Sequence, residues 1–176
     1  MARVLFLQDT LYESFGPEML SAVLRADGHE CRLLVVGEEG RGGIMAAVRR
    51  FAPDVAAFSV PSFGVRWAVE LARQVKDHLG VLTVFGGPHC SCFPDFAHQP
   101  AVDLACVGEG EGAIVDLARA VDAGDDPRDI QNLLWSDAEG RVQRNAVRPL
   151  VEDLDVLPFQ DRELYYGYRP LRSLSY

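Results

Sequence analysis

Four short segments of this sequence carry, between them, glycine, hydroxyl and acidic residues that suit a ligand site. Each one follows a run of apolar residues, and together they span 8–13, 59–64, 86–89 and 108–112. Glycine at such positions lets a flat or bulky ligand lie against the backbone. Glu109 and Glu111 would repel a pyrophosphate at a helix start. The pattern therefore favours a neutral or amide-rich ligand.

Three common ligand chemistries of α/β sheets do not suit these segments. A phosphoacceptor domain needs an aspartate after the third apolar run, where Ser59 stands. The loop over residues 9–14 has two acids and no glycine, so it serves a flavin phosphate poorly. A dinucleotide fingerprint needs its glycines after the first strand. Here the Gly-x-Gly-x-Gly run begins at Gly108, after the fifth.

Metal and catalytic interpretations are also weak. Cys90 and Cys92 are closer together than the usual zinc spacing, and no second pair lies at a standard distance. A cysteine nucleophile needs a base, and only His89 is near in the sequence. Glu109 and Glu111 are better explained as acids at a helix N-terminus than as a catalytic pair. We therefore predict no catalytic residue and no metal ligand from the protein.

The other histidines and cysteines suggest structural positions. His29 is expected to be exposed at the start of a strand, and His98 to lie in a loop. Cys31 and Cys106 fall within apolar runs and are expected to be small core residues.

These segments must be positioned by a regular α/β framework. Apolar runs alternate with amphipathic stretches that have helical periodicity, most clearly over 65–79. The predicted strands span 3–8, 29–36, 55–59, 81–85 and 103–107. Such alternation predicts a doubly wound, flavodoxin-like (Rossmann-like) α/β fold with a five-stranded parallel sheet in the order 2-1-3-4-5. The carboxyl ends of parallel strands meet at one edge, which brings the four segments together.

The character of the chain changes after Gly124. Residues 132–136 and 141–144 predict a small β-hairpin. Residues 149–176 have no long periodic element but are rich in Pro, Tyr and Leu, which predicts an extended tail lying on its own surface or on a partner's. We therefore divide the chain into an α/β domain over 1–124 and a hairpin and linker over 125–176.

Composition narrows the function further. The 176 residues carry 17 basic and 26 acidic side chains, a net charge of −9, so a nucleic-acid partner is not expected. The apolar runs are too short for a membrane span or a signal peptide. Four cysteines are too few for a disulfide framework, so a cytoplasmic location is expected.

The motifs together resemble a known family. Ser59-x-Pro61, Gly86-Gly-Pro-His89, Val107-Gly-Glu-Gly-Glu111 and the stretch from Asp153 to Phe159 resemble the cobalamin-binding (vitamin B12-binding) domain of B12-dependent radical SAM enzymes. The resemblance covers nearly the whole chain. In that family a three-cysteine cluster follows, and this sequence stops where the cluster would begin. We therefore expect a non-catalytic N-terminal domain of a longer enzyme.

The resemblance implies a cobalamin site at the strand ends, with Ser59 bonding the buried nucleotide tail and Gly86 and Gly87 letting it pass. The implied residues are Asp9, Thr10, Leu11 and Tyr12; Ser59, Val60, Pro61, Ser62 and Phe63; Trp67; Gly86, Gly87, Pro88 and His89; and Gly108, Glu109, Gly110 and Glu111. Glu109 and Glu111 would accept hydrogen bonds from corrin amides or a ribose hydroxyl. The parent enzyme would also hold a 4Fe-4S cluster and S-adenosylmethionine, and its radical SAM domain would be the partner of this domain.

One departure from related cobalamin proteins is informative. Many carry Asp-x-His-x-x-Gly after the first strand, and the histidine ligates cobalt. Here Leu11 takes the place of the histidine and Ser14 that of the glycine. The resemblance then implies base-off cobalamin without a histidine ligand, its lower face near Leu11, Tyr12, Phe63 or Trp67. Such cobalt suits methyl transfer from S-adenosylmethionine. Cyclisation or rearrangement without net methylation, or a stand-alone flavodoxin-like binding or sensory domain, are the alternatives.

Overall fold

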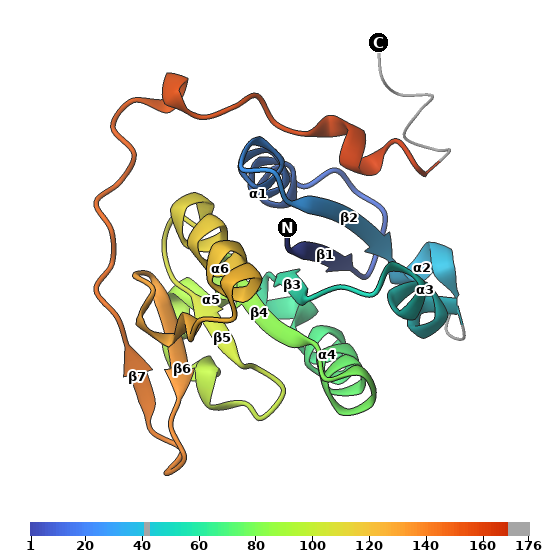
Figure 1. The fold of residues 1–176 in the computed structure, drawn as a ribbon. Helices are drawn as coiled ribbons and strands as arrows, with labels where there is room; N and C mark the ends of the chain where they lie inside the picture. The colour runs from blue at the N-terminus through green and yellow to red at the C-terminus, as the bar shows by residue number, and fades with distance from the viewer. Residues whose placement is uncertain (41–42, 169–176) are drawn as a thin grey trace.

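The computed structural model describes residues 1–40 and 43–168, over which seven strands form one sheet in the order β2-β1-β3-β4-β5-β6-β7 (Figure 1). The strands are β1 (Arg3–Gln8), β2 (Glu30–Val35), β3 (Val55–Ser59), β4 (Leu82–Gly86), β5 (Leu104–Cys106), β6 (Leu133–Ser136) and β7 (Val142–Arg144). The α-helices are α1 (Phe15–Ala26), α2 (Val36–Glu39), α3 (Gly43–Phe51), α4 (Val65–Leu79), α5 (Pro88–Cys92) and α6 (Glu111–Ala123). Short 3-10 helices are η1 (Ser62–Gly64), η2 (Pro94–His98), η3 (Pro127–Asp129), η4 (Leu154–Val156) and η5 (Arg162–Tyr165).

The first five strands are parallel and follow the predicted order 2-1-3-4-5, which confirms the flavodoxin-like arrangement. Their near-continuous apolar sequences suit strands that are covered on both faces. Because all five run the same way, their carboxyl ends meet at one edge of the sheet, as expected for the four loop segments.

The sheet has seven strands rather than the predicted five. The hairpin β6–β7 does not stand apart but continues the sheet, with β6 antiparallel to β5 through the pairs Ala105↔Leu134 and Cys106↔Leu133. Burial explains the difference, because Leu133 and Leu134 are only 1% and 4% exposed. Two consecutive apolar side chains point to opposite faces of a strand, so both become buried only inside a two-sided sheet.

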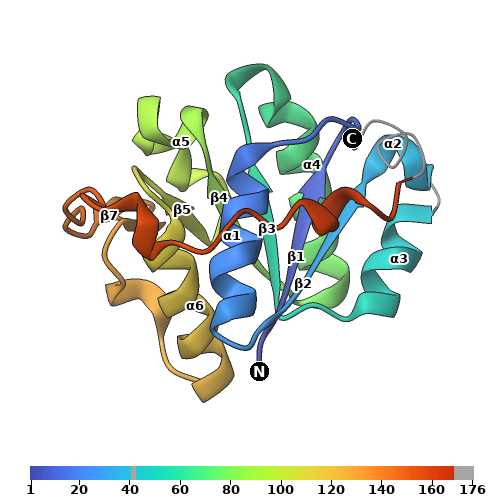
Figure 2. The ribbon, with the colours of Figure 1, turned by 90° about the horizontal axis from the view of Figure 1, so that it is seen from above.

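Two helical layers cover the sheet (Figures 1 and 2). Helices α3, α4 and α5 with η2 pack on one face and share a core with Phe58 and Phe85. Helices α1 and α6 with η5 pack on the other face, around Phe6 and Val84. We call these the packed face and the α1/α6 face.

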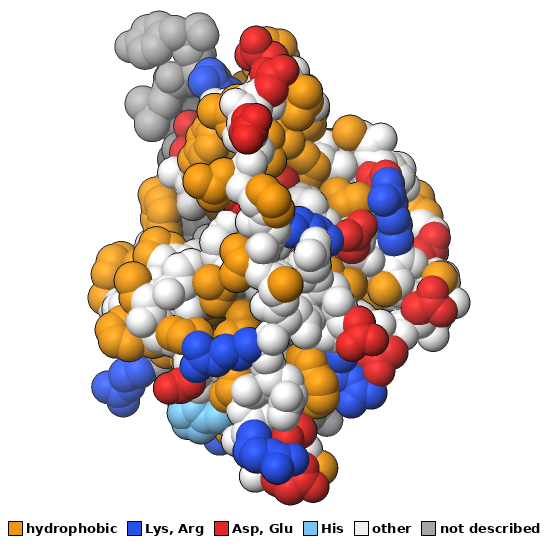
Figure 3. All heavy atoms as spheres, turned by 90° about the vertical axis from the view of Figure 1, so that its left-hand side faces the viewer, with side chains coloured by type: hydrophobic (Ala, Val, Ile, Leu, Met, Phe, Trp, Pro, Cys, Tyr) orange, Lys and Arg blue, Asp and Glu red, His pale blue; other side chains and the backbone are white. Residues whose placement is uncertain are grey.

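Residues 145–168, called here the C-terminal segment, cross the outside of α1 toward β2 (Figure 2). Asp161 fastens the segment to α1, accepting a hydrogen bond from Ser21 Oγ at 2.6 Å and pairing with Arg25 at 3.0 Å. The predicted tail therefore lies on the protein's own surface over these residues, whereas Tyr176 lies outside the described residues. Figure 3 shows the side of the molecule that carries the hairpin, where apolar and charged side chains are interspersed.

The prediction that His29 is exposed was wrong, since its side chain is buried. Its Nδ1 accepts a hydrogen bond from the backbone N–H of Ala2 at 3.1 Å, and Nε2 lies 3.1 Å from Asp27. These two contacts satisfy both ring nitrogens beneath the start of β1, so burial leaves neither unpaired. In the described part of the chain, no helix combines the length and apolarity needed to cross a bilayer.

Candidate functional site

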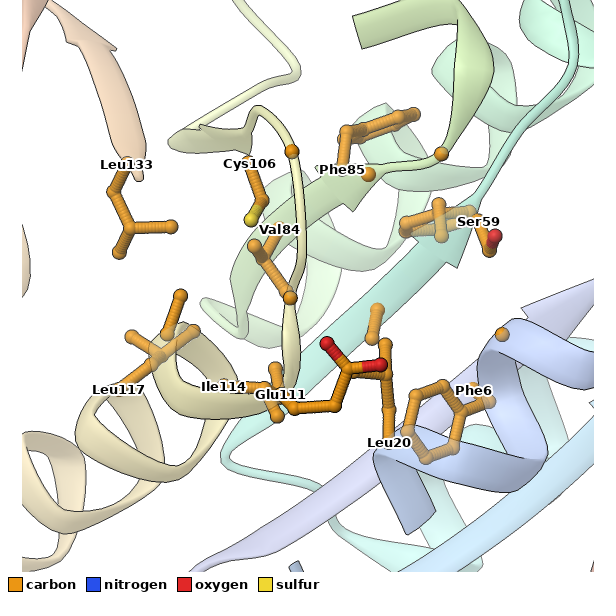
Figure 4. A pocket seen from close by; sticks show the side chains of 18 residues that line it. Phe6, Leu20, Ser59, Val84, Phe85, Cys106, Glu111, Ile114, Leu117 and Leu133 are labelled. Carbon is orange, nitrogen blue, oxygen red and sulfur yellow. The ribbon is translucent and has the colours of Figure 1, made fainter. Parts of the chain in front are cut away.

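A cavity of about 190 Å³ opens at the carboxyl edge of the sheet, on the α1/α6 face (Figure 4). Its walls come from four parallel strands, the antiparallel strand β6, helices α1 and α6, and the loops between them. The lining residues are Phe6, Gly16, Leu20, Ala57, Phe58, Ser59, Val84, Phe85, Gly86, Gly87, Cys106, Gly108, Gly110, Glu111, Ala113, Ile114, Leu117 and Leu133. Most are apolar, with a few polar groups near the mouth, as is usual in pockets for small molecules.

Small side chains on adjacent strands create this space. Ala57 pairs with Val84 across β3 and β4, and Ser59 pairs with Gly86. Because side chains alternate along a strand, these residues point to the same face of the sheet. The side chains of Ala57, Ser59 and Gly86 are too small to fill the space between the sheet and helices α1 and α6. A close-packed interior normally has no gap larger than a water molecule, so this cavity results from the small side chains at these positions.

Gly87 holds the backbone at the rim of the cavity. Its φ is +90°, a conformation that side-chain-bearing residues rarely adopt. A Cβ here would lie 3.0 Å from the Val60 nitrogen and 3.1 Å from Ser59 Oγ. Glycine is thus required by backbone angle and by space, and it leaves Ser59 reachable from the cavity.

The two acids predicted as hydrogen-bond acceptors differ in their surroundings. The Glu111 side chain extends from the first turn of α6 toward Leu20 and Phe6 (Figure 4), and its buried Oε2 has no hydrogen-bond partner within the described chain. Glu109 instead accepts a hydrogen bond at Oε2 from the Val151 N–H at 2.8 Å. Glu111 therefore faces the cavity, whereas Glu109 anchors the C-terminal segment.

A thiol also lines the cavity. Burial, reinforced by the charge of Glu111, raises the pKa of Cys106 to about 12. The thiol is therefore neutral at physiological pH and adds to the apolar lining rather than acting as a nucleophile.

The structure brings part of the predicted set together. The predicted residues that line the cavity are Ser59, Gly86, Gly87, Gly108, Gly110 and Glu111. Those outside its lining are Asp9, Thr10, Leu11, Tyr12, Val60, Pro61, Ser62, Phe63, Trp67, Pro88, His89 and Glu109. The first group forms part of the wall of one pocket, and the second does not line it.

The loop after β1 has an internally bonded conformation. The Gln8 side-chain amide donates to the carbonyl oxygens of Thr10 and Tyr12, at 2.6 and 2.8 Å. Leu11 is half-buried against the α1/α6 core, and Tyr12 is partly exposed. Leu11 thus presents an aliphatic side chain that packs inward.

Other predicted residues belong to the packed face. Val60 is fully buried there, and the Trp67 ring lies 6.2 Å from Phe58. His89 Nδ1 lies 3.0 Å from Ser62 Oγ, and the ring packs edge-on against Phe96. Within residues 1–40 and 43–168, no three His, Cys, Asp or Glu side chains lie close enough together to hold a metal ion.

The inner wall of the cavity was not predicted from the sequence, because it lies within the strands and helices rather than beyond the strand ends. The missed residues are Phe6, Gly16, Leu20, Ala57, Phe58, Val84, Phe85, Cys106, Ala113, Ile114, Leu117 and Leu133. The two-residue alternation was a usable signal, since counting back from Ser59 and Gly86 leads to Ala57 and Val84.

Comparison with known proteins agrees with this arrangement. Residues 9–118 match the family described as B12 binding domain. An uncharacterised methyltransferase of Pyrococcus horikoshii is 27% identical over 124 residues, covering 69% of this chain and 27% of that protein. The anaerobic magnesium-protoporphyrin IX monomethyl ester cyclase of Rubrivivax gelatinosus is 25% identical over 175 residues, covering 87% of this chain and 31% of that protein.

Among solved structures, the cobalamin-dependent S-adenosylmethionine radical enzyme OxsB, with aqua-cobalamin and S-adenosylmethionine bound, superposes with a TM-score of 0.78 at 18% identity. The match covers 96% of this chain and 26% of OxsB. The chain thus spans between about a quarter and a third of the length of these three proteins. The fold, the cavity at its carboxyl edge and the match over residues 9–118 agree: the chain belongs to the B12-binding domain family.

Proposed function

We propose that this chain holds cobalamin base-off, with the nucleotide base in the cavity, and presents it to a radical SAM domain for methyl transfer from S-adenosylmethionine. The observation that carries the proposal is the apolar cavity at the carboxyl edge, beside a loop with Leu11 where a ligating histidine would stand. In open parallel sheets this edge is where ligands bind.

The residues of the cavity suit a flat aromatic base with a polar edge. Ala57, Val84, Ile114 and their neighbours offer apolar walls, and the Ser59 hydroxyl offers a hydrogen-bond partner near the mouth. The unpartnered Oε2 of Glu111 supplies an acceptor for a hydroxyl or amide N–H of the ligand. Filling the cavity would thus satisfy a buried polar atom and cover apolar surface together.

The loop after β1 determines what lies beneath the corrin ring. Bound cobalamin supplies a cobalt atom able to carry a methyl group, and a weaker lower ligand favours its low-valent, nucleophilic form. Leu11 has no donor atom, so it excludes a protein nitrogen from this position. The chain's own contribution is to bind the cofactor, to orient it and to keep its lower face free of a strong ligand.

A second outcome for the parent enzyme is supported by one comparison. The relative from Rubrivivax gelatinosus is named as a cyclase and matches over 87% of this chain. Cyclisation without net methylation is thus the alternative reaction. Either reaction uses the same cofactor cavity, so the proposals below hold for both.

The test is an anaerobic titration of the chain with hydroxocobalamin, followed by desalting and a visible spectrum. We expect close to one equivalent of corrin to be retained. Reduction to the cobalt(II) state and an electron paramagnetic resonance spectrum then report the lower ligand. We expect a spectrum without the nitrogen splitting that a coordinated histidine or benzimidazole produces.

Two results would contradict the proposal. Loss of all corrin on desalting would exclude tight binding by this chain, and nitrogen splitting on cobalt would exclude the base-off, histidine-free state. The His78→Ala variant is the matched control, because His78 lies in the last turn of α4, a helix of the packed face. Its spectrum should equal that of the unaltered chain.

A further inference from the structure

The C-terminal segment reaches back to the first strand through one tyrosine. Tyr165 is fully buried, and its hydroxyl donates a hydrogen bond to Gln8 Oε1 at 2.8 Å. The same hydroxyl accepts a hydrogen bond from the backbone N–H of Ser14 at 3.2 Å. One side chain of the C-terminal segment thus contacts the last residue of β1 and the last residue of the β1–α1 loop, which spans residues 9–14.

Gln8 connects Tyr165 to the middle of the loop through hydrogen bonds. Its side chain is 5% exposed, and its amide nitrogen donates to the carbonyl oxygens of Thr10 and Tyr12. The hydrogen bonds thus run without a break from Tyr165 through Gln8 to two loop carbonyls. Every polar atom of the Gln8 side chain has a partner in this network, as a buried amide requires.

The direction of these bonds fixes the orientation of Gln8. A tyrosine hydroxyl has one hydrogen, and here it points at Gln8 Oε1, so the amide nitrogen must face the loop. Burial raises the pKa of Tyr165 above its ordinary value, so the hydroxyl keeps its proton. Without this hydroxyl, Gln8 Oε1 and the Ser14 N–H would both lose a partner, and the amide could turn away from the loop.

We propose that Tyr165, acting through Gln8, is a positioning residue that fixes the β1–α1 loop beneath the corrin of bound cobalamin. The inference rests on the proposed function, because it is that proposal which places the loop under the cofactor. It goes further by making the lower side of the site depend on the C-terminal segment, some 150 residues along the chain from the loop it orders. Displacement of η5 would then loosen the loop.

The same segment provides a matched control. The Tyr168 hydroxyl accepts a hydrogen bond from the Val35 N–H at 2.8 Å, at the end of β2. Tyr165 and Tyr168 are therefore two tyrosines, three residues apart, that fasten one segment to two different places. Replacing either with phenylalanine removes a single oxygen atom. Only Tyr165→Phe should disturb the loop.

The first measurement uses the chain without cobalamin. Hydrogen exchange of backbone amides, followed by NMR, should show the Ser14 amide exchanging about tenfold faster in Tyr165→Phe, because its acceptor is gone. The Val35 amide should be unchanged in that variant and faster in Tyr168→Phe. Equal exchange at Ser14 in Tyr165→Phe and the unaltered chain would overturn the inference, whether or not cobalamin binds.

The second measurement uses the chain loaded with hydroxocobalamin. We expect Tyr165→Phe to bind about tenfold more weakly and to show a broadened cobalt(II) resonance, because several loop conformations then lie beneath the metal. Tyr168→Phe should match the unaltered chain in both respects. Faster exchange at Ser14 with an unchanged affinity and resonance would overturn the link to the cofactor. Failure of the unaltered chain to retain cobalamin would overturn the proposed function and this link with it, but not the loop contact itself.

A double variant tests the route through Gln8. Gln8→Met removes the amide while keeping a similar volume, and an unfolding midpoint shows whether each variant still folds. If Tyr165 acts through Gln8, the double variant should bind cobalamin no more weakly than the weaker single variant. Independent, multiplying losses would mean that Tyr165 acts by another route and would overturn the inference.

Discussion

The two faces of the sheet differ in how completely they are filled. On the packed face, the rings of Phe58 and Phe85 stack at 4.7 Å, and Phe96 packs edge-on against Phe85 at 5.3 Å. On the α1/α6 face, the neighbouring positions Ala57 and Ser59 of the same strand border a cavity. One strand, β3, thus supplies an aromatic core to one side and an open space to the other.

The difference shows how a short strand serves stability and binding at once. Alternating side chains let the large residues of β3 and β4 secure the packed face while small ones leave room on the other. Substitutions on the packed face should therefore act mainly on the free energy of unfolding. Substitutions on the α1/α6 face should act mainly on ligand affinity.

The largest expected effect comes from adjacent alanines of β3. Ala57→Leu puts a branched side chain into the cavity, and we expect cobalamin affinity to fall about 100-fold while the free energy of unfolding changes by less than about 1 kcal/mol. Ala56→Leu places the same side chain in the filled core of the packed face, where overpacking costs about 1–3 kcal/mol. Denaturant unfolding and hydroxocobalamin titration measure both.

The contrast between the two faces would be contradicted if Ala57→Leu and Ala56→Leu changed affinity and stability in the same way. A large stability loss in Ala57→Leu would mean that the cavity closes in solution. Unchanged affinity in Ala57→Leu would place the cofactor elsewhere on the carboxyl edge.

A smaller effect is expected within the α1/α6 face. Glu111→Gln exchanges an acceptor oxygen of the cavity for an amide group, and we expect about tenfold weaker cobalamin binding from the lost charged acceptor. Glu109→Gln is the control, because glutamine keeps an oxygen that can accept from Val151, and its affinity should stay within about twofold. Equal affinities of the two variants would show that Glu111 makes no contact with the ligand.

The smallest expected effect is a difference in alkylation rate between Cys90 on the packed face and Cys106 on the α1/α6 face. Burial raises the pKa of both Cys90 and Cys106 to about 12, so the thiolate fraction, and with it the alkylation rate, should rise about tenfold per pH unit between pH 7 and 9. Cys106 borders the cavity and Cys90 is fully buried, so an uncharged maleimide should modify Cys106 several-fold faster. Mass spectrometry of the two peptides measures the rates.

Bound hydroxocobalamin should fill the cavity and slow the modification of Cys106 to the rate of Cys90. If Cys106 reacted as slowly as Cys90 without the cofactor, the cavity would not be accessible to small molecules. Protection of Cys90 alone would point to the packed face as the binding surface.

The elements that follow from local patterns were predictable. Strands β1 and β3 have the bounds given by their apolar runs, and the alternation with helices correctly indicated that the first five strands are parallel. Glycines beyond the strand ends line one wall of the cavity, and Gly87 is required there by its backbone angle. These features depend on neighbours in the sequence, and a single sequence shows such neighbours directly.

Features that depend on distant contacts were not predictable. The three-residue strand β5 gives no sign that β6 will pair with it. The course of the C-terminal segment depends on Asp161 meeting Ser21, 140 residues away, and on Tyr165 meeting Gln8. The different roles of Glu109 and Glu111 follow from that course as well, because only the folded segment brings Val151 to Glu109. No local pattern carries this information.

The Tyr168 contact has a consequence for how copies of this protein behave toward one another. A free sheet edge is a template on which a strand from another chain can add. At the β2 edge, the Tyr168 hydroxyl already accepts from the Val35 N–H, and the C-terminal segment lies beside the strand. At the opposite edge, β7 spans three residues and ends at Arg144, which pairs with Asp95 at 2.6 Å. Both margins of the sheet thus resist edge-to-edge aggregation, by a covering segment on one side and by brevity and charge on the other.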